Sequence, residues 1–206
     1  MSKIEGKKMS FVLGITGGIA TGKSTAVEVF QKYDFPIVDG DQVARQVVEP
    51  GTPGGAAVVS EFGDDILQKN GSLDRKKLGR IVFSDKQKLD RLNQILNPYI
   101  RSEILRQIEK GKSEAPLVIA DIPLMYEGHY DHYMDQVAVV YLPEEIQLER
   151  LMKRDNLSLE EASKRIKSQL SMEEKRRRAD IFFDNQGTIQ QLQEQITSWL
   201  RQKKFI

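Results

Sequence analysis

A glycine-rich stretch, GITGGIATGKSTA (14–26), restricts the fold more than any other part of the chain. Residues 17–24 match the pattern G-x-x-x-x-G-K-[ST], with a strand-like apolar run before them and a helical pattern after them. Glycine lets the backbone curl closely around a phosphate, and the following helix adds partial positive charge at its N-terminus. The stretch therefore predicts a strand–loop–helix unit that binds a nucleoside triphosphate. The competing interpretation, a chance match in a glycine-rich turn, explains neither flank.

Within this loop, residue types assign individual roles. Lys23 is expected to neutralise the β- and γ-phosphates, and the hydroxyl of Ser24 is expected to bind Mg²⁺. The expected phosphate-binding residues are Gly17, Gly18, Ile19, Ala20, Thr21, Gly22, Lys23, Ser24 and Thr25. The motif therefore predicts binding of a magnesium–nucleotide complex, without naming the reaction.

Five short apolar runs without alternation predict strands that are buried on both faces. These runs are residues 11–16, 36–39, 117–122, 137–142 and 181–184. Helical patterns separate them, including one at about 21–33, a charged one at 144–179 with a break near Asp155 and Asn156, and a last amphipathic one at 188–204. Strands that alternate with helices predict an α/β fold with a parallel sheet.

One connection, from residue 40 to residue 116, is far too long for a simple crossover between parallel strands. Apolar residues recur in it at helical spacing between 89 and 108, which predicts an inserted helical subdomain. Asn97 and Pro98 interrupt this pattern. We therefore predict two helices, with Asn97 capping the second and Pro98 at its first position.

Acidic residues follow two of the predicted strands. Asp39 and Asp41 close the second strand, and Asp121 ends the third. The carboxyl ends of parallel strands face the ligand crevice, where a kinase needs one carboxylate near the acceptor hydroxyl and others to hold the metal through water. The alternative is that these residues cap the segments that follow. For Asp121, the sequence favours neither interpretation.

The segment 148–178 is rich in arginine, and Arg150 and Arg154 share a helix face at i, i+4. Such arginines predict a lid that stabilises charge on a phosphoryl group during transfer. A solvated helix face is the alternative. The basic run 175–178 also suggests nucleic acid, but two glutamates precede it and the formal net charge of the chain is only +1.

Composition excludes several function classes. The chain has no cysteine, which rules out disulfides, thiolate metal sites and thiol nucleophiles and fits a reducing compartment. No apolar stretch approaches the roughly 20 residues of a membrane span. The basic start (1–8) predicts a flexible arm rather than a signal peptide, so we expect a cytoplasmic protein without membrane or nucleic-acid partners. His129 and His132 are expected to lie in a surface loop rather than a zinc site.

Together these motifs resemble the dephospho-coenzyme A kinase family. The resemblance is carried along most of the chain by ITGGIATGKST, VDGDQVARQVVEPG, LNQILNPYIR, DIPLMYE, the arginine-rich segment and ADIFFDNQG. It implies ATP-dependent phosphorylation of the ribose 3′-hydroxyl of dephospho-CoA, the last step of coenzyme A biosynthesis, on a P-loop kinase core with strand order 2-3-1-4-5. It also implies that Asp41 is the base, that Arg150 and Arg154 are lid arginines, and that Asn185 and Gly187 approach adenine. From its position after the second strand, Asp39 is expected to orient Mg²⁺ water and is the alternative candidate for the base.

The expected organisation is a single kinase domain, 9–206, with a substrate-binding insertion at about 45–114 and a lid at about 148–179. The core would then comprise about 9–44, 115–147 and 180–206. Two rivals remain: a nucleoside monophosphate kinase with the same core, and a nucleotide-dependent switch. A GTP-reading switch normally carries N-K-x-D, and the chain has no such tetrapeptide.

Overall fold

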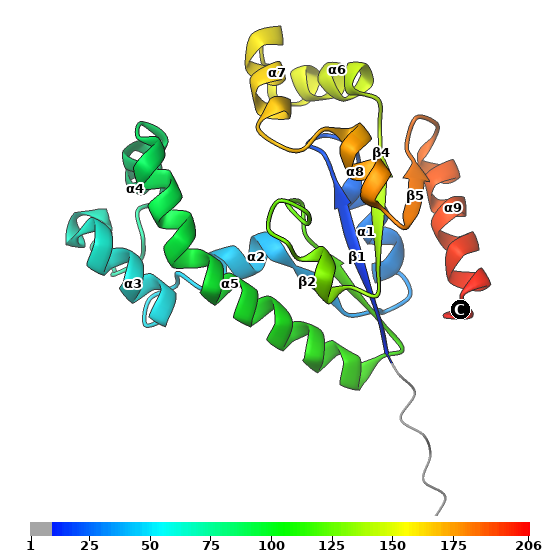
Figure 1. The fold of residues 1–206 in the computed structure, drawn as a ribbon, viewed down its shortest axis with the longest axis horizontal. Helices are drawn as coiled ribbons and strands as arrows, with labels where there is room; N and C mark the ends of the chain where they lie inside the picture. Colours follow the sequence, from blue (N-terminus) through cyan, green and yellow to red (C-terminus); the bar gives the residue numbers. More distant parts are fainter. Residues whose placement is uncertain (1–9) are drawn as a thin grey trace, which may run out of the picture. The chain divides into compact units, whose positions relative to one another are not determined.

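The computed structural model describes residues 10–206, so the arm predicted at 1–8 lies outside the described residues. Its centre is a five-stranded sheet with the order β2-β3-β1-β4-β5 (Figure 1). The strands are β1 Phe11–Gly17, β2 Ile37–Asp39, β3 Leu117–Asp121, β4 Gln136–Tyr141 and β5 Ile181–Asp184. β1 pairs in parallel with both β3 and β4, and β4 pairs in parallel with β5. Each strand lies within one residue of its predicted bounds, and the predicted order is confirmed.

Helices follow the strands as the hydrophobic patterns indicate. They are α1 Lys23–Gln31, α2 Gly40–Gln46, α3 Pro53–Phe62, α4 Arg75–Phe83, α5 Lys86–Glu114, α6 Glu144–Asp155, α7 Leu159–Lys167, α8 Met172–Arg178 and α9 Ile189–Gln202, with short 3₁₀ turns at Asp64–Ile66 and Asp131–Tyr133. The predicted break near Asp155 is confirmed, because α6 ends at Asp155 and the next residue, Asn156, has a left-handed conformation with φ 52°. In the described part of the chain, no helix is both long and apolar enough to cross a membrane.

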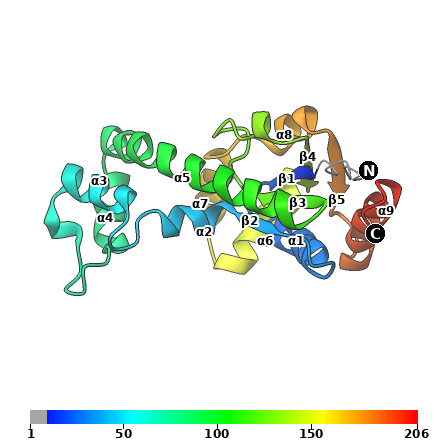
Figure 2. The same ribbon diagram turned by 90° about the horizontal axis from the view of Figure 1, so that it is seen from below.

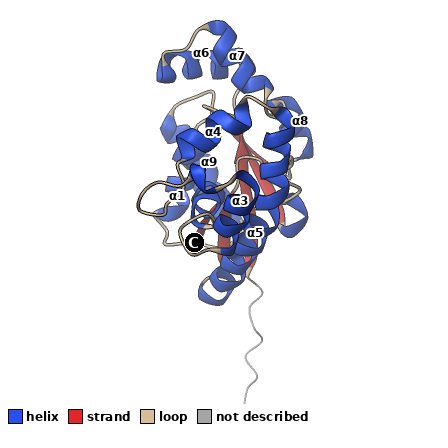
Figure 3. Cartoon of the chain, turned by 90° about the vertical axis from the view of Figure 1, so that its left-hand side faces the viewer, coloured by secondary structure: helices blue, strands red, loops and turns tan. Residues whose placement is uncertain are grey.

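The two faces of the sheet bury different side chains. Ile15, Ile119 and Val140 point to one face and pack with Phe30 of α1 and Trp199 of α9. Figures 2 and 3 show α9 beside α1 on this side. The opposite face is covered in part by α8: Met172 packs on Val139 and Tyr141. Because both faces are covered, the strands are apolar at nearly every position, which is why they are recognisable in the sequence.

By its contacts the chain divides into two compact units. Among the described residues, the first comprises 10–38 and 108–206, and it holds most of the sheet. The second, Asp39–Gln107, is helical, and its buried apolar residues include Val58, Ile66, Leu78 and Val82. The long connection seen in the sequence thus forms a unit that buries apolar residues of its own.

The predicted pair of helices around Asn97 and Pro98 is wrong, because α5 continues through both residues as one helix. Pro98 lacks the N–H that would bond the carbonyl of Gln94. Both residues are exposed, so water can satisfy that carbonyl and the helix tolerates the missing bond. Burial of residues further along, such as Ile104 and Ile108, favours continuation of the helix.

Candidate active site

The loop between β1 and α1 is held in a conformation that requires glycine. Gly22 has φ 87°, and a Cβ added there would overlap the side-chain nitrogen Nδ2 of Asn185. A Cβ on Gly18 would lie 2.5 Å from Nε2 of Gln147 and 2.8 Å from Sδ of Met172. Ala20 also adopts positive φ, 62°, which is uncommon for a residue with a side chain. Close neighbours therefore explain both glycines, and the left-handed backbone conformation is a second reason at Gly22.

Side chains from distant segments fix the backbone of this loop. Asn185, which is only 6% exposed, donates from Nδ2 to the carbonyl of Thr21 at 2.7 Å. Gln147 donates from Nε2 to the carbonyl of Ile19 at 2.7 Å, and Gln169 accepts from the Ile19 N–H at 3.1 Å. Within the loop, the Thr21 hydroxyl donates to the carbonyl of Gly18 at 2.9 Å. The loop is thus preorganised by α6, by the α7–α8 connection and by the end of β5.

Lys23, the first residue of α1, forms an ion pair with Asp121, the last residue of β3. The two side chains are 15% and 12% exposed, so the pair is shielded from water. Asp121 is thus the direct partner of the lysine expected to bind phosphate, a pairing that the sequence did not predict.

Two hydroxyl residues follow in the first turn of α1. Ser24 is exposed and Thr25 is half-buried. A hydroxyl at this position is available to an outside ligand, and the helix N-terminus favours negative charge nearby.

The two aspartates after β2 have different local positions. Asp39 is the N-cap of α2: its Oδ1 accepts from the N–H groups of Asp41 at 2.8 Å and of Gln42 at 3.0 Å. Asp41 lies in the first helical turn with an exposed side chain. The capping interpretation therefore holds for Asp39, whose second carboxylate oxygen is left for other uses. Asp41 presents its whole carboxylate to solvent.

The arginines of α6 differ in their partners. Arg150 donates from Nη2 to the backbone carbonyl of Asn185 at 3.2 Å, which brings it to the end of β5. Arg154 makes a two-point contact with Asp155, at 2.8 Å and 3.1 Å, and Arg165 donates to the same carboxylate at 3.0 Å. The hydrogen bond from Arg154 holds the pKa of Asp155 below its usual range. Two of the five N–H donors of Arg154 are thus engaged by Asp155.

Gly187 lies in the exposed segment that joins β5 to α9. With Asp184, Gln191, Glu194 and Gln195 it lines a cavity of about 470 Å³. A side chain at Gly187 would collide with Gln191, which closes the capping box of α9 with Thr188. Glycine here leaves the cavity open beside the end of β5.

His129 and His132 lie in an exposed turn, with the Asp131 carboxylate between them. One candidate ligand atom from each of the three lies within 4.8 Å of the other two, a set that can be drawn around a divalent ion. The two imidazole rings are stacked with centroids 6.5 Å apart. Both histidines are exposed, whereas Asp131 is half-buried.

Sequence reasoning missed one functional candidate, Lys175, which it considered only as part of the basic run 175–178. The structure buries this lysine completely and pairs it with Glu127 at 3.2 Å. A signal was present, since Met172 and Ala179 at i−3 and i+4 put Lys175 on the apolar side of its helix.

Comparisons with known proteins agree along nearly the whole chain. The family model described as dephospho-CoA kinase matches residues 11–191. The dephospho-CoA kinase of Enterococcus faecalis is 57% identical over 195 residues, which cover 95% of this chain and 98% of that protein. That of Latilactobacillus sakei is 47% identical, covering 93% and 95%. A solved dephospho-CoA kinase from Campylobacter jejuni superposes with a TM-score of 0.75 at 31% identity, covering 95% of this chain and 98% of the other.

Proposed function

The chain belongs to the dephospho-CoA kinase family, and we propose that it transfers the γ-phosphoryl group of ATP to the 3′-hydroxyl of dephospho-CoA. The observation that carries this proposal is the family match over residues 11–191, which contains the phosphate loop, both aspartates after β2 and the arginines of α6. The products would be coenzyme A and ADP.

The glycine loop suits a triphosphate. Its backbone is fixed from outside, Gly18 and Gly22 leave no side chain in the way, and Ser24 is accessible. In the proposed complex Lys23 exchanges Asp121 for phosphate oxygens, and its ammonium neutralises charge that develops during transfer. The fixed loop contributes by holding the phosphate in place rather than by making or breaking bonds.

Magnesium fits the oxygen donors that the chain offers, since Mg²⁺ prefers hydroxyl and carboxylate oxygens and retains several waters. Ser24 would hold the ion directly, and Asp39 through water with the carboxylate oxygen that does not cap α2. When bound, the ion supplies positive charge to the phosphates.

Asp41 is the proposed base for the 3′-hydroxyl. Its exposed carboxylate is free to accept a proton, and the N–H of Asp41 is held by Asp39, so its backbone position is fixed. Proton transfer to Asp41 would raise the nucleophilicity of the hydroxyl as it attacks.

The segment 148–179 is proposed to act as a lid whose α6 arginines, Arg150 and Arg154, close over the phosphates. Arg150, already bonded to the carbonyl of Asn185, would stabilise charge on the transferred group, and Arg154 would join it after leaving Asp155. Because the side-chain amide of Asn185 is committed to Thr21, the approach to adenine is assigned to the backbone of this segment and to Gly187.

The second unit is the proposed binding region for dephospho-CoA. It contains a cavity of about 340 Å³ whose walls are largely apolar, lined by Gln46, Val47, Thr52, Pro53, Gly54, Tyr99, Ser102 and Glu103. An apolar cavity with a few polar groups is the usual form of a small-molecule site.

The lack of cysteine fits a reducing compartment, so the proposed location is the cytoplasm.

A panel of acceptors tests the proposal. ADP release from ATP and Mg²⁺ is measured with dephospho-CoA, AMP, CMP or dTMP, with Lys23→Met as the inactive control. We expect ADP release only when dephospho-CoA is the acceptor. Preference for a nucleoside monophosphate would identify the rival kinase, and tight GTP binding without acceptor-dependent turnover would identify a switch.

A further inference from the structure

Lys175 is the anomaly in the basic run at the end of α8. Its side chain is 0% exposed, whereas the arginines at 176–178 are exposed. An ammonium removed from water destabilises a protein unless it is paired and hydrogen-bonded. A buried lysine therefore needs hydrogen-bond acceptors and a negative charge close to its ammonium.

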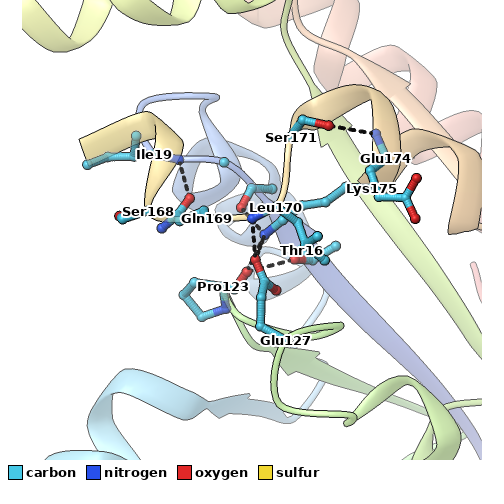
Figure 4. Close-up of polar contacts among 12 residues, drawn as sticks. Thr16, Ile19, Pro123, Glu127, Ser168, Gln169, Leu170, Ser171, Glu174 and Lys175 are labelled. Carbon is cyan, nitrogen blue, oxygen red and sulfur yellow. Dashed lines mark hydrogen bonds and ion pairs between the residues drawn. The ribbon is translucent and has the colours of Figure 1, made fainter. Parts of the chain in front are cut away.

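Three segments supply those partners. Nζ of Lys175 donates to the carbonyl of Pro123 at 2.9 Å and to that of Gly17 at 3.4 Å, and it lies 3.2 Å from Oε1 of Glu127 (Figure 4). The three N–H donors of an ammonium match these three acceptors. Burial lowers the pKa of Lys175, and the charge of Glu127 opposes that shift.

Each acceptor belongs to a part of the candidate active site. Gly17 is the last residue of β1 and the first of the phosphate loop. Pro123 lies two residues beyond Asp121, the partner of Lys23, and its carbonyl also accepts from the Thr16 hydroxyl at 2.9 Å. Lys175 thus bonds to the backbone of the segment that precedes Lys23 and of the segment that follows Asp121.

Glu127 extends the network to the connection between α7 and α8. Its Oε1 also accepts from the N–H of Leu170 at 2.9 Å, and the neighbouring Gln169 accepts from Ile19 in the phosphate loop (Figure 4). The C-terminal end of the lid segment is therefore joined to the phosphate loop through Lys175 and Glu127.

We propose that Lys175 is a positioning residue for phosphoryl transfer, which with Glu127 anchors α8 to the phosphate loop and sets the position of Gly17 against the segment that follows Asp121. Given the proposed function, lid movement would then involve α6 and α7, while α8 stays with the core. Nucleotide binding and the chemical step both depend on this placement, whereas binding of dephospho-CoA does not.

The test compares Lys175→Met with Arg177→Met, an equal loss of charge on the same helix from a side chain that is 76% exposed. For Lys175→Met we expect kcat to fall by about 10- to 100-fold, the order expected for a displacement of roughly 1 Å at a reacting centre. KM for ATP should rise, and KM for dephospho-CoA should stay within twofold of wild type. Arg177→Met should match wild type in all three constants.

Glu127→Gln provides a second variant in case Lys175→Met fails to fold. Its amide oxygen can still accept from Leu170, but the charge is gone, so we expect the same pattern with a severalfold smaller effect. A folded variant with a lower melting temperature but with kcat and KM for ATP within twofold of wild type would overturn the proposal, because a purely structural role would act on stability alone.

Calorimetric titration with ATP, in the absence of acceptor, separates this proposal from the proposed function. Lys175→Met should bind ATP more weakly even if dephospho-CoA proves not to be the acceptor. Unchanged ATP affinity in a folded variant would contradict the anchoring role, whatever the acceptor is.

Discussion

The ammonium of Lys23 and the carboxylate of Asp121 form a shielded ion pair at the carboxyl-terminal edge of β3. A triphosphate that binds Lys23 must displace this carboxylate. In Asp121→Asn we therefore expect ATP without metal to bind about tenfold more tightly, because a charged hydrogen bond worth roughly 1.5–3 kcal/mol no longer competes. Calorimetry with EDTA measures this affinity. Weaker metal-free binding in the variant would contradict the competition.

Substitutions of Lys23 and Asp41 should differ in their effects on ATP binding and on the chemical step. Lys23→Met should weaken ATP binding and turnover together, because the ammonium contacts phosphate before and during transfer. Asp41→Asn should lower kcat by about 10²–10⁴-fold, the usual contribution of a general base, with little change in ATP affinity. Steady-state kinetics measures kcat, and titration with ATP measures the affinity of each variant. Retention of more than about a tenth of wild-type kcat in Asp41→Asn would exclude Asp41 as the base.

Asp39 has a capping role that two substitutions can isolate from its proposed metal role. Asp39→Asn keeps an oxygen that accepts from Asp41 and Gln42, so α2 should keep its stability while the Mg²⁺ concentration for half-maximal rate rises. Asp39→Ala should also lose about 0.5–2 kcal/mol of stability, the usual value of an N-cap. If Asp39→Asn abolishes turnover at saturating Mg²⁺, the roles of Asp39 and Asp41 should be exchanged.

Gly22 should be far less tolerant of a side chain than another glycine of the same conformation. Gly22→Ala must accommodate positive φ and a clash with Asn185, whereas Gly71, with φ 80°, has no atom within 4 Å of an added Cβ. Gly71→Ala should cost only the roughly 1–2 kcal/mol of left-handed backbone. Thermal unfolding should show the larger loss for Gly22→Ala, together with weaker ATP binding. Equal losses would show that Asn185 simply moves aside.

Glu103, in the wall of the cavity in the second unit, should remain ionised in acid. The hydrogen bond from Arg106 lowers its pKa from 4.5 to about 2. A lowered folded-state pKa stabilises the fold above the unfolded pKa, and the contribution disappears as the pH falls through about 2. The difference in unfolding free energy between wild type and Glu103→Gln should therefore shrink as the pH falls from about 5. A constant difference would contradict the role of Arg106.

The fold was largely predictable because its elements carry strong local signals. Strands buried on both faces are apolar throughout, and the loop glycines, the Asp155 break and the cap at Thr188 all leave marks in the sequence. Pro98 was misleading, since a proline tolerates a helix interior when the carbonyl that it leaves unpaired lies exposed.

Contacts between distant residues were the part that the sequence concealed. Neither the Lys23–Asp121 pair nor the bond from Asn185 to Thr21 follows from spacing, because each joins segments about 100 or more residues apart. Lys175 was hidden by composition, since a lysine beside three arginines resembles a solvated surface. The roles of the remaining site residues stay predictions that the variants above test.

The most direct test of the account is a ³¹P NMR spectrum of wild-type protein with ATP, Mg²⁺ and dephospho-CoA, followed until the ATP is consumed. We predict a new phosphomonoester resonance that coincides with the 3′-phosphate of authentic coenzyme A and grows in equal amount with ADP. Accumulation of ADP with inorganic phosphate, or a phosphomonoester at any other position, would contradict phosphorylation of the 3′-hydroxyl.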